Sequence, residues 1–100
     1  MASHITMDEL RSILCNYLKE FKDFETSVDD LLHSVSNLEM TFYLNDVKRT
    51  IDEGMEACRN AIRCKTEQTP YQKWKVQRDA SYLLHTLKPR LDYVISVLLK

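Results

Sequence analysis

Three cysteines, Cys15, Cys58 and Cys64, are the most nucleophilic side chains in this sequence. A catalytic thiolate needs a histidine base that a third group holds nearby, and no pattern in the sequence places one. The spacing of the cysteines also matches no set of zinc ligands. An odd number of cysteines without a signal peptide favours free thiols in a reducing, intracellular compartment such as the cytoplasm. Cys58 falls on an apolar helix face, so we expect it in the core.

Metal and phosphate chemistry have little support in the sequence. Asp29 and His33 lie one helical turn apart, with Asp30 beside them, but there is no second histidine cluster and no Glu-x-x-His pair for a di-metal site. With Gly54 as the single glycine, no glycine-rich loop can hold a phosphate. Gly54 instead predicts a close approach of two helices. We therefore expect no catalytic residue, no metal and no cofactor.

Aromatic and basic side chains share one face of the last expected helix. Tyr71, Tyr82 and Tyr93 are spaced eleven residues apart, which returns to within about 20° of the starting direction on a helix. Aromatic residues and arginine are typical of the centres of protein interfaces, so this face predicts a partner-binding surface. The alternatives are that the tyrosines pack against the other helices, or that the rings stack nucleic-acid bases. The other members of this face are Trp74, Lys75, Arg78 and His85.

Arg78 and His85 also enclose six residues, and seven positions on a helix bring two side chains to one face. This pair is similar to the Arg-x(4–6)-His signature of HEPN ribonucleases, which are small all-α domains. The resemblance implies a pair that acts on the RNA phosphodiester across a dimer. A nucleic-acid-binding domain or a HEPN-type ribonuclease is therefore the alternative function.

The charges are unevenly distributed along a chain whose net charge is only −1. Residues 7–36 carry a net charge of −4 and residues 70–100 a net charge of +4. The small total gives no general attraction to nucleic acid or anionic lipid, so nucleic acid is an unlikely partner. The asymmetry predicts attraction between adjacent helices, or a functional basic strip on the last helix that suits an acidic partner helix.

The helix that carries the aromatic face begins near residue 70. Thr69 and Gln72 form a capping box around Pro70, which is favoured at the first helical position. The apolar phase continues through Pro89, which favours one helix kinked there; a break that leaves a short fourth helix is the alternative. The apolar positions are Val76, Ala80, Leu83, Leu84, Leu87, Leu91, Val94 and Leu98.

The first helix has the most regular pattern. Thr6 and Glu9 form a capping box at its start. Its apolar residues follow an unbroken heptad spacing, which is typical of a coiled coil or a long bundle helix, and flanking leucines and an isoleucine widen the apolar stripe enough for two neighbours. The heptad positions are Leu10, Leu14, Tyr17, Phe21, Phe24, Val28, Leu31, Val35 and Leu38.

A second helix follows in a different register. Ser36 and Glu39 form a third capping box at the change of phase, which predicts a tight turn; one unbroken helix over 7–65 is the alternative. Phe42 points away from the apolar stripe. It either folds back over the turn or is exposed for a partner, in which case Met40, Phe42 and Tyr43 make this end of the bundle a second candidate interface. The apolar positions are Met40, Leu44, Val47, Ile51, Met55, Cys58 and Ile62.

Three helices of about 26–30 residues with short connections predict an all-α fold, an elongated antiparallel three-helix bundle with up-down-up topology. We expect residues 1–6 to be a leader added during cloning or disordered, and residues 7–100 to form a single domain with no membrane span. The architecture resembles spectrin repeats and the N-terminal regulatory domains of syntaxins. We expect a non-catalytic protein–protein interaction module, an adaptor, scaffold or oligomerisation domain; a homo-oligomer that shares the apolar seam is left open.

Overall fold

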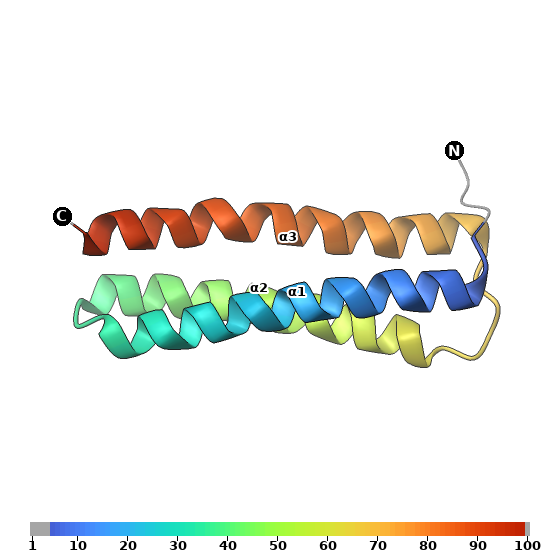
Figure 1. The fold of residues 1–100 in the computed structure, drawn as a ribbon, viewed down its shortest axis with the longest axis horizontal. Coiled ribbons are helices and arrows are strands. Elements are labelled where there is room, and N and C mark those ends of the chain that lie inside the picture. The colour runs from blue at the N-terminus through green and yellow to red at the C-terminus, as the bar shows by residue number, and fades with distance from the viewer. Residues whose placement is uncertain (1–4, 100) are drawn as a thin grey trace.

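The computed structural model describes residues 5–99, so residues 1–4 of the predicted leader lie outside the described residues, whereas Ile5 packs against the core and Thr6 caps α1. Three helices, α1 (Met7–Ser34), α2 (Leu38–Arg63) and α3 (Pro70–Leu98), lie lengthwise beside one another in a body of 48 × 24 × 17 Å. Each helix contacts both others. Figure 1 shows that α1 and α3 run in the same direction and α2 runs against them. The predicted all-α, up-down-up bundle is confirmed.

Capping boxes begin α1 and α3 as the sequence predicts. The Thr6 hydroxyl accepts a hydrogen bond from the Glu9 amide at 3.1 Å, and the Glu9 carboxylate accepts one from the Thr6 amide at 3.0 Å. Hydrogen bonding with Thr6 lowers the pKa of Glu9 below its ordinary value, and the Thr6 backbone amide contributes more to this than the Thr6 hydroxyl. Thr69 and Gln72 form the same pair of bonds at the start of α3. These reciprocal bonds satisfy amides that a helix start otherwise leaves without partners.

The turn between α1 and α2 occurs where the phase changes, but its cap differs from the prediction. The N-cap of α2 is Asn37 rather than Ser36, since the Asn37 amide oxygen accepts bonds from the amides of Glu39 at 2.8 Å and Met40 at 3.3 Å. Asparagine is among the best N-caps, because its short side chain reaches these amides. The unbroken helix over 7–65 is wrong. Leu38, predicted as the last apolar position of the first helix, begins α2 and is 67% exposed.

Two cations that the sequence patterns did not single out hold the connection between α2 and α3. Arg11 of α1 donates hydrogen bonds to the carbonyl oxygens of Ile62 at 3.3 Å and Cys64 at 2.9 Å, where its charge meets the negative end of α2. Lys73 of α3 is buried, donates to the Ile5 carbonyl at 2.9 Å and pairs with Glu67 at 2.6 Å. Arg11 thus fastens the end of α2 to α1, which is distant in sequence, and Lys73 joins the connection at Glu67 to the start of α3 and to the segment before α1.

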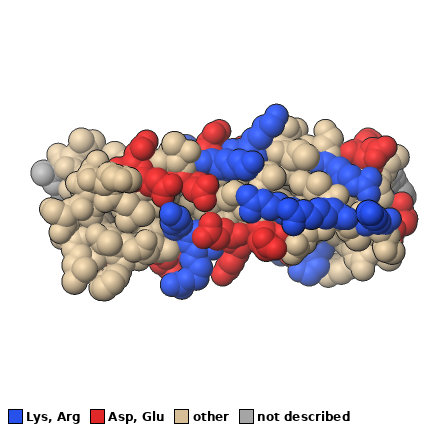
Figure 2. All heavy atoms as spheres, turned by 90° about the horizontal axis from the view of Figure 1, so that it is seen from below, with Lys and Arg blue, Asp and Glu red and all other residues tan. Residues whose placement is uncertain are grey.

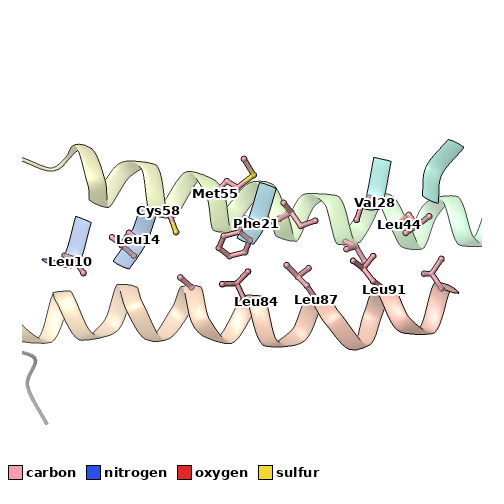
Figure 3. Close-up of a cluster of buried hydrophobic side chains, with 14 of the residues drawn as sticks. Leu10, Leu14, Phe21, Val28, Leu44, Met55, Cys58, Leu84, Leu87 and Leu91 are labelled. Atoms are coloured by element: carbon pink, nitrogen blue, oxygen red, sulfur yellow. The ribbon is translucent and has the colours of Figure 1, made fainter. Parts of the chain in front are cut away.

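The predicted apolar stripes meet in one core along the bundle axis. Leu10, Leu14, Phe21 and Val28 of α1 are fully buried, and most of the predicted positions of α2 and α3 are buried with them. Figure 3 shows the Phe21 ring between α2 and α3, near Met55 and Leu84. The predicted burial of Cys58 is confirmed, and that burial raises the pKa of its thiol to about 11. This thiol therefore stays protonated at neutral pH and is a poor nucleophile.

Gly54 provides the close helix approach that the sequence predicts. It lies buried in α2 directly against the Phe21 ring, and a Cβ atom built on it would overlap that ring. The largest side chain of the core thus fills the space that the missing side chain leaves.

α3 continues through Pro89 without a break, so the prediction of a single helix is confirmed and the alternative of a short fourth helix is wrong. Proline has no amide hydrogen, so the His85 carbonyl loses its usual helical partner at this point. Pro89 is exposed, while Leu87, Leu91 and Val94 on either side of it stay in the core. Leu98, predicted as the last core position, is 38% exposed because it ends the helix.

Ion pairs between helices involve α2 rather than joining the acidic α1 to the basic α3. Lys48 of α2 pairs with Asp29 of α1 at 3.0 Å, and Arg90 of α3 pairs with Asp46 of α2 at 2.8 Å. Within residues 5–99, no ion pair joins α1 to α3. The opposite charges of these two helices therefore act on each other only without direct pairing, as where the charge of Lys73 contributes to lowering the pKa of Glu9.

Candidate interaction surface on helix α3

The aromatic side chains predicted to share a face of α3 are all exposed to solvent. Tyr71 is 61% exposed, Trp74 38%, Tyr82 67% and Tyr93 50%, whereas the apolar stripe of α3 already fills the core. The alternative that the tyrosines pack against the other helices applies only to Tyr93, which contacts Tyr43 of α2. These rings are not needed to close the bundle.

Trp74 forms the centre of a small cluster near the start of α3. The Tyr71 ring lies against it, with 5.8 Å between ring centroids, and the Arg78 guanidinium lies over it at 5.3 Å from the ring centroid. Residues three and four positions apart are neighbours on a helix, and this spacing brings the three side chains together. The guanidinium is attracted to the negative face of the indole. Arg78 pairs with no carboxylate among the described residues.

Lys75 contributes less free charge than the sequence suggests. Its amino group donates a hydrogen bond to the Asp79 carboxylate at 2.8 Å. That bond and the charge of Asp79 raise the pKa of Lys75 above its ordinary value. The positive charge that this face offers to a partner therefore lies mainly on Arg78.

His85 and Tyr93 lie at opposite edges of the predicted face. The His85 ring nitrogen Nδ1 is 3.4 Å from the Ser81 hydroxyl, and the residue lines a hollow between α1 and α3. Tyr93 instead makes an edge contact with Tyr43 of α2, with 5.5 Å between ring centroids. Eight residues turn a helix by about 80° beyond two full turns, which separates the two directions. The structure thus places Tyr71, Trp74, Arg78 and Tyr82 on the outer face, and His85 and Tyr93 at its margins.

Arg78 and His85, the pair that resembles the ribonuclease signature, do not contact each other. Seven residues rise by about 10.5 Å along a helix. Arg78 stacks on Trp74 and His85 lies near Ser81, with no hydrogen bond between the two in the described part of the chain. The geometry therefore gives no support to a composite Arg–His site within one copy.

The other candidate groups can be placed as well. The His33 ring nitrogen Nδ1 lies 2.7 Å from the Asp29 carbonyl oxygen, and no three histidine, cysteine or carboxylate side chains within residues 5–99 gather as metal ligands would. Among the same residues, no helix is long and apolar enough to cross a membrane.

Two large apolar side chains are exposed at the end of the bundle that carries the α1–α2 turn. Phe42 is 65% exposed there, beside the exposed Leu38, whereas Met40 is buried. Figure 2 shows charged side chains over the middle of the visible face and, among the described residues, none over this end of that face. The predicted second candidate interface therefore reduces to Phe42 and its exposed leucine neighbour.

A groove between α1 and α3 was not predicted from the sequence. Two hollows, of about 620 Å³ and about 430 Å³, share Phe24, Lys88 and Asp92 in their linings. Tyr17 and Leu31 extend the α1 wall in the two directions from Phe24. Tyr17, Phe24 and Leu31 are spaced seven residues apart, so the sequence shows that they form one row on α1. The spacing does not show that α2 and α3 leave this row partly exposed.

No known protein family matches this chain, and neither a curated protein nor a solved structure matches it. The fold therefore defines its class, a three-helix bundle, and the surfaces described above carry the argument on function.

Proposed function

We propose that the protein is a non-catalytic helical interaction module that binds a protein partner through the outer face of α3, centred on Trp74, Arg78 and Tyr82. The observation that supports this most is the exposed Tyr71–Trp74–Arg78 cluster, which forms outside a core that is complete without it. A large aromatic ring left in water gains nothing, whereas its burial at the centre of an interface is often worth about 2 kcal/mol or more.

The charge of this face favours an acidic partner, for instance a helix that docks alongside α3. Lys75 is balanced by Asp79, but Arg78 has no carboxylate partner among the described residues. Arginine stacked on tryptophan keeps its outward donors free, and a carboxylate can accept two of them at once. A partner carboxylate beside an apolar side chain would match Arg78 and the neighbouring rings.

The double substitution Trp74→Ala with Tyr82→Ala tests this proposal. We expect the melting temperature to stay within a few degrees of the wild-type value, because neither ring is part of the core. We also expect proteins captured from a cell extract by the wild type to be lost, as quantified by mass spectrometry. Glu56→Ala with Asn60→Ala is the control, since it truncates two exposed side chains of α2 that belong to neither candidate interface.

Two outcomes would count against the proposal. One is a large loss of stability, about 3 kcal/mol or more, which would place the rings in the core. The other is unchanged capture by the double variant. If binding or cleavage of a single-stranded RNA is lost in the double variant or in His85→Ala, the nucleic-acid alternative replaces the protein partner.

A further inference from the structure

The heptad pattern of α1 has two rows, and one of them, although fully buried at Leu10, is only partly covered from Tyr17 to Leu31. Leu14, Phe21 and Val28 are fully buried in the core. Tyr17, Phe24 and Leu31 recur at the same seven-residue interval, yet each is only half-buried. In a helical bundle both rows of such a pattern are normally packed against neighbouring helices. The second row of α1 therefore lacks part of its packing.

This second row forms one wall of the groove between α1 and α3. Leu84, Leu91 and Ile95 of α3 contribute apolar surface to the opposite wall, and Ile95 remains 43% exposed. All residues that line the two hollows belong to α1 or α3. From Tyr17 to Leu31 the groove follows α1 for about 21 Å, the length of about four helical turns.

The topology places this groove where a fourth helix belongs. α1 and α3 are parallel and α2 is antiparallel to both (Figure 1). In an up-down-up-down four-helix bundle, the fourth helix lies between the first and the third, antiparallel to both and opposite the second. A helix in the groove would occupy that position and cover the half-buried row of α1.

The charges around the groove specify what kind of helix fits. Glu20, Asp23 and Asp30 of α1 lie along the groove, and none of them forms an ion pair with a residue in the described range 5–99. Lys88 and Asp92 pair with each other at 3.4 Å, which balances their charges. The groove thus combines an apolar floor with a net acidic rim, and basic residues on a partner would be attracted to that rim.

We propose that the groove between α1 and α3 binds a basic amphipathic helix of a protein partner, which runs antiparallel to α1 and completes a four-helix bundle. The apolar side of that helix would pack on Tyr17, Phe24 and Leu31, and lysines or arginines at its edges would meet Glu20, Asp23 and Asp30. This surface is separate from the outer face of α3 and opposite to it in charge. An intact second copy is a poor fit, because the apolar stripe of its basic helix α3 is already buried in its own core.

The test uses two synthetic amphipathic peptides of about four helical turns with leucine at the a and d positions. One carries lysine at the flanking positions and the other carries glutamate. We expect the lysine peptide to bind the full chain at least about tenfold more tightly in calorimetric titrations, with an affinity that falls as salt is raised. Equal affinities for the two peptides would overturn the proposal.

Matched variants locate the binding. Ser27 is exposed and lines the groove, so Ser27→Trp should fill the groove and weaken binding of the lysine peptide at least about tenfold, whereas Ala57→Trp adds the same side chain to an exposed position of α2 and should not. Circular dichroism checks that both variants remain folded. Unchanged binding by Ser27→Trp would overturn the proposal, as would a wild-type dimer that Ser27→Trp converts to a monomer, because a second copy would then occupy the groove.

A charge reversal provides a second readout that does not depend on filling the groove. Glu20→Lys with Asp23→Lys should reverse the preference from the lysine peptide to the glutamate peptide. Asp52→Lys with Glu53→Lys makes the same change at exposed positions of α2, outside the groove, and should leave the preference unchanged. Trp74→Ala should not alter peptide affinity, so failure at this groove and failure at the outer face of α3 are distinguishable.

Discussion

Replacing Leu14 with aspartate is expected to unfold the protein. Leu14 is fully buried in the core, and Figure 3 shows it close to Cys58 of α2. A buried carboxylate without a partner costs several kcal/mol. Domains of this size are stabilised by only about 5–10 kcal/mol in total, so such a loss removes most or all of the stability. Circular dichroism at 222 nm, with a thermal melt, measures the result.

Two comparisons on the same helix make this prediction specific. Asn16 is exposed, so Asn16→Asp adds the same charge to α1 and is expected to change the free energy of unfolding by less than about 0.5 kcal/mol. Leu31 shares the heptad pattern but is only half-buried beside the groove, so Leu31→Asp is expected to cost less than Leu14→Asp. Equal losses in all three variants would mean that the assigned phase of α1 is wrong.

Gly54→Ala is expected to destabilise the protein by about 1–3 kcal/mol, although alanine is the better helix former by about 1 kcal/mol. The new Cβ atom would overlap the ring of Phe21, which is the largest of the fully buried side chains. The ring must then shift in a region that is closely packed on all sides. Urea denaturation of the wild type and the variant gives the difference in free energy of unfolding.

A double-mutant cycle separates this overlap from a general intolerance of α2. Phe21→Leu removes the ring and leaves a cavity of its own. In that background Gly54→Ala should cost less than in the wild type, because the overlapping atoms are gone and the added methyl group fills part of the space. Additive effects of the two substitutions would show that Gly54 and Phe21 do not interact as the structure indicates.

The sequence predicted the helices and their buried faces because these depend on local spacing. The heptad positions of α1 and the capping boxes at Thr6 and Thr69 involve residues within a few positions of one another. The cap of α2 was assigned to Ser36 instead of Asn37, because both are good caps and only the backbone geometry decides between them. Errors of this kind move a helix end by one residue and leave the fold unchanged.

Contacts between distant segments could not be predicted in the same way. Arg11 binds carbonyl groups more than fifty residues away, and Lys73 reaches the Ile5 carbonyl. The spacing predicted that the aromatic residues of α3 share a face, but the exposure of that face and its division between Trp74, His85 and Tyr93 depend on where α1 and α2 lie beside α3. The groove depends on the same arrangement, since spacing alone does not show which apolar row lacks a neighbour.

The accessibility of Trp74 in solution tests the central claim, that the outer face of α3 is free to bind a partner. Trp74 is the only tryptophan of the chain, so its fluorescence reports on this face alone. Acrylamide quenching and sedimentation equilibrium, measured on the same sample, relate its exposure to the oligomeric state. We expect a monomer in which acrylamide readily quenches Trp74; a dimer in which Trp74 is protected would contradict the proposal, because a second copy of the chain would then occupy this face.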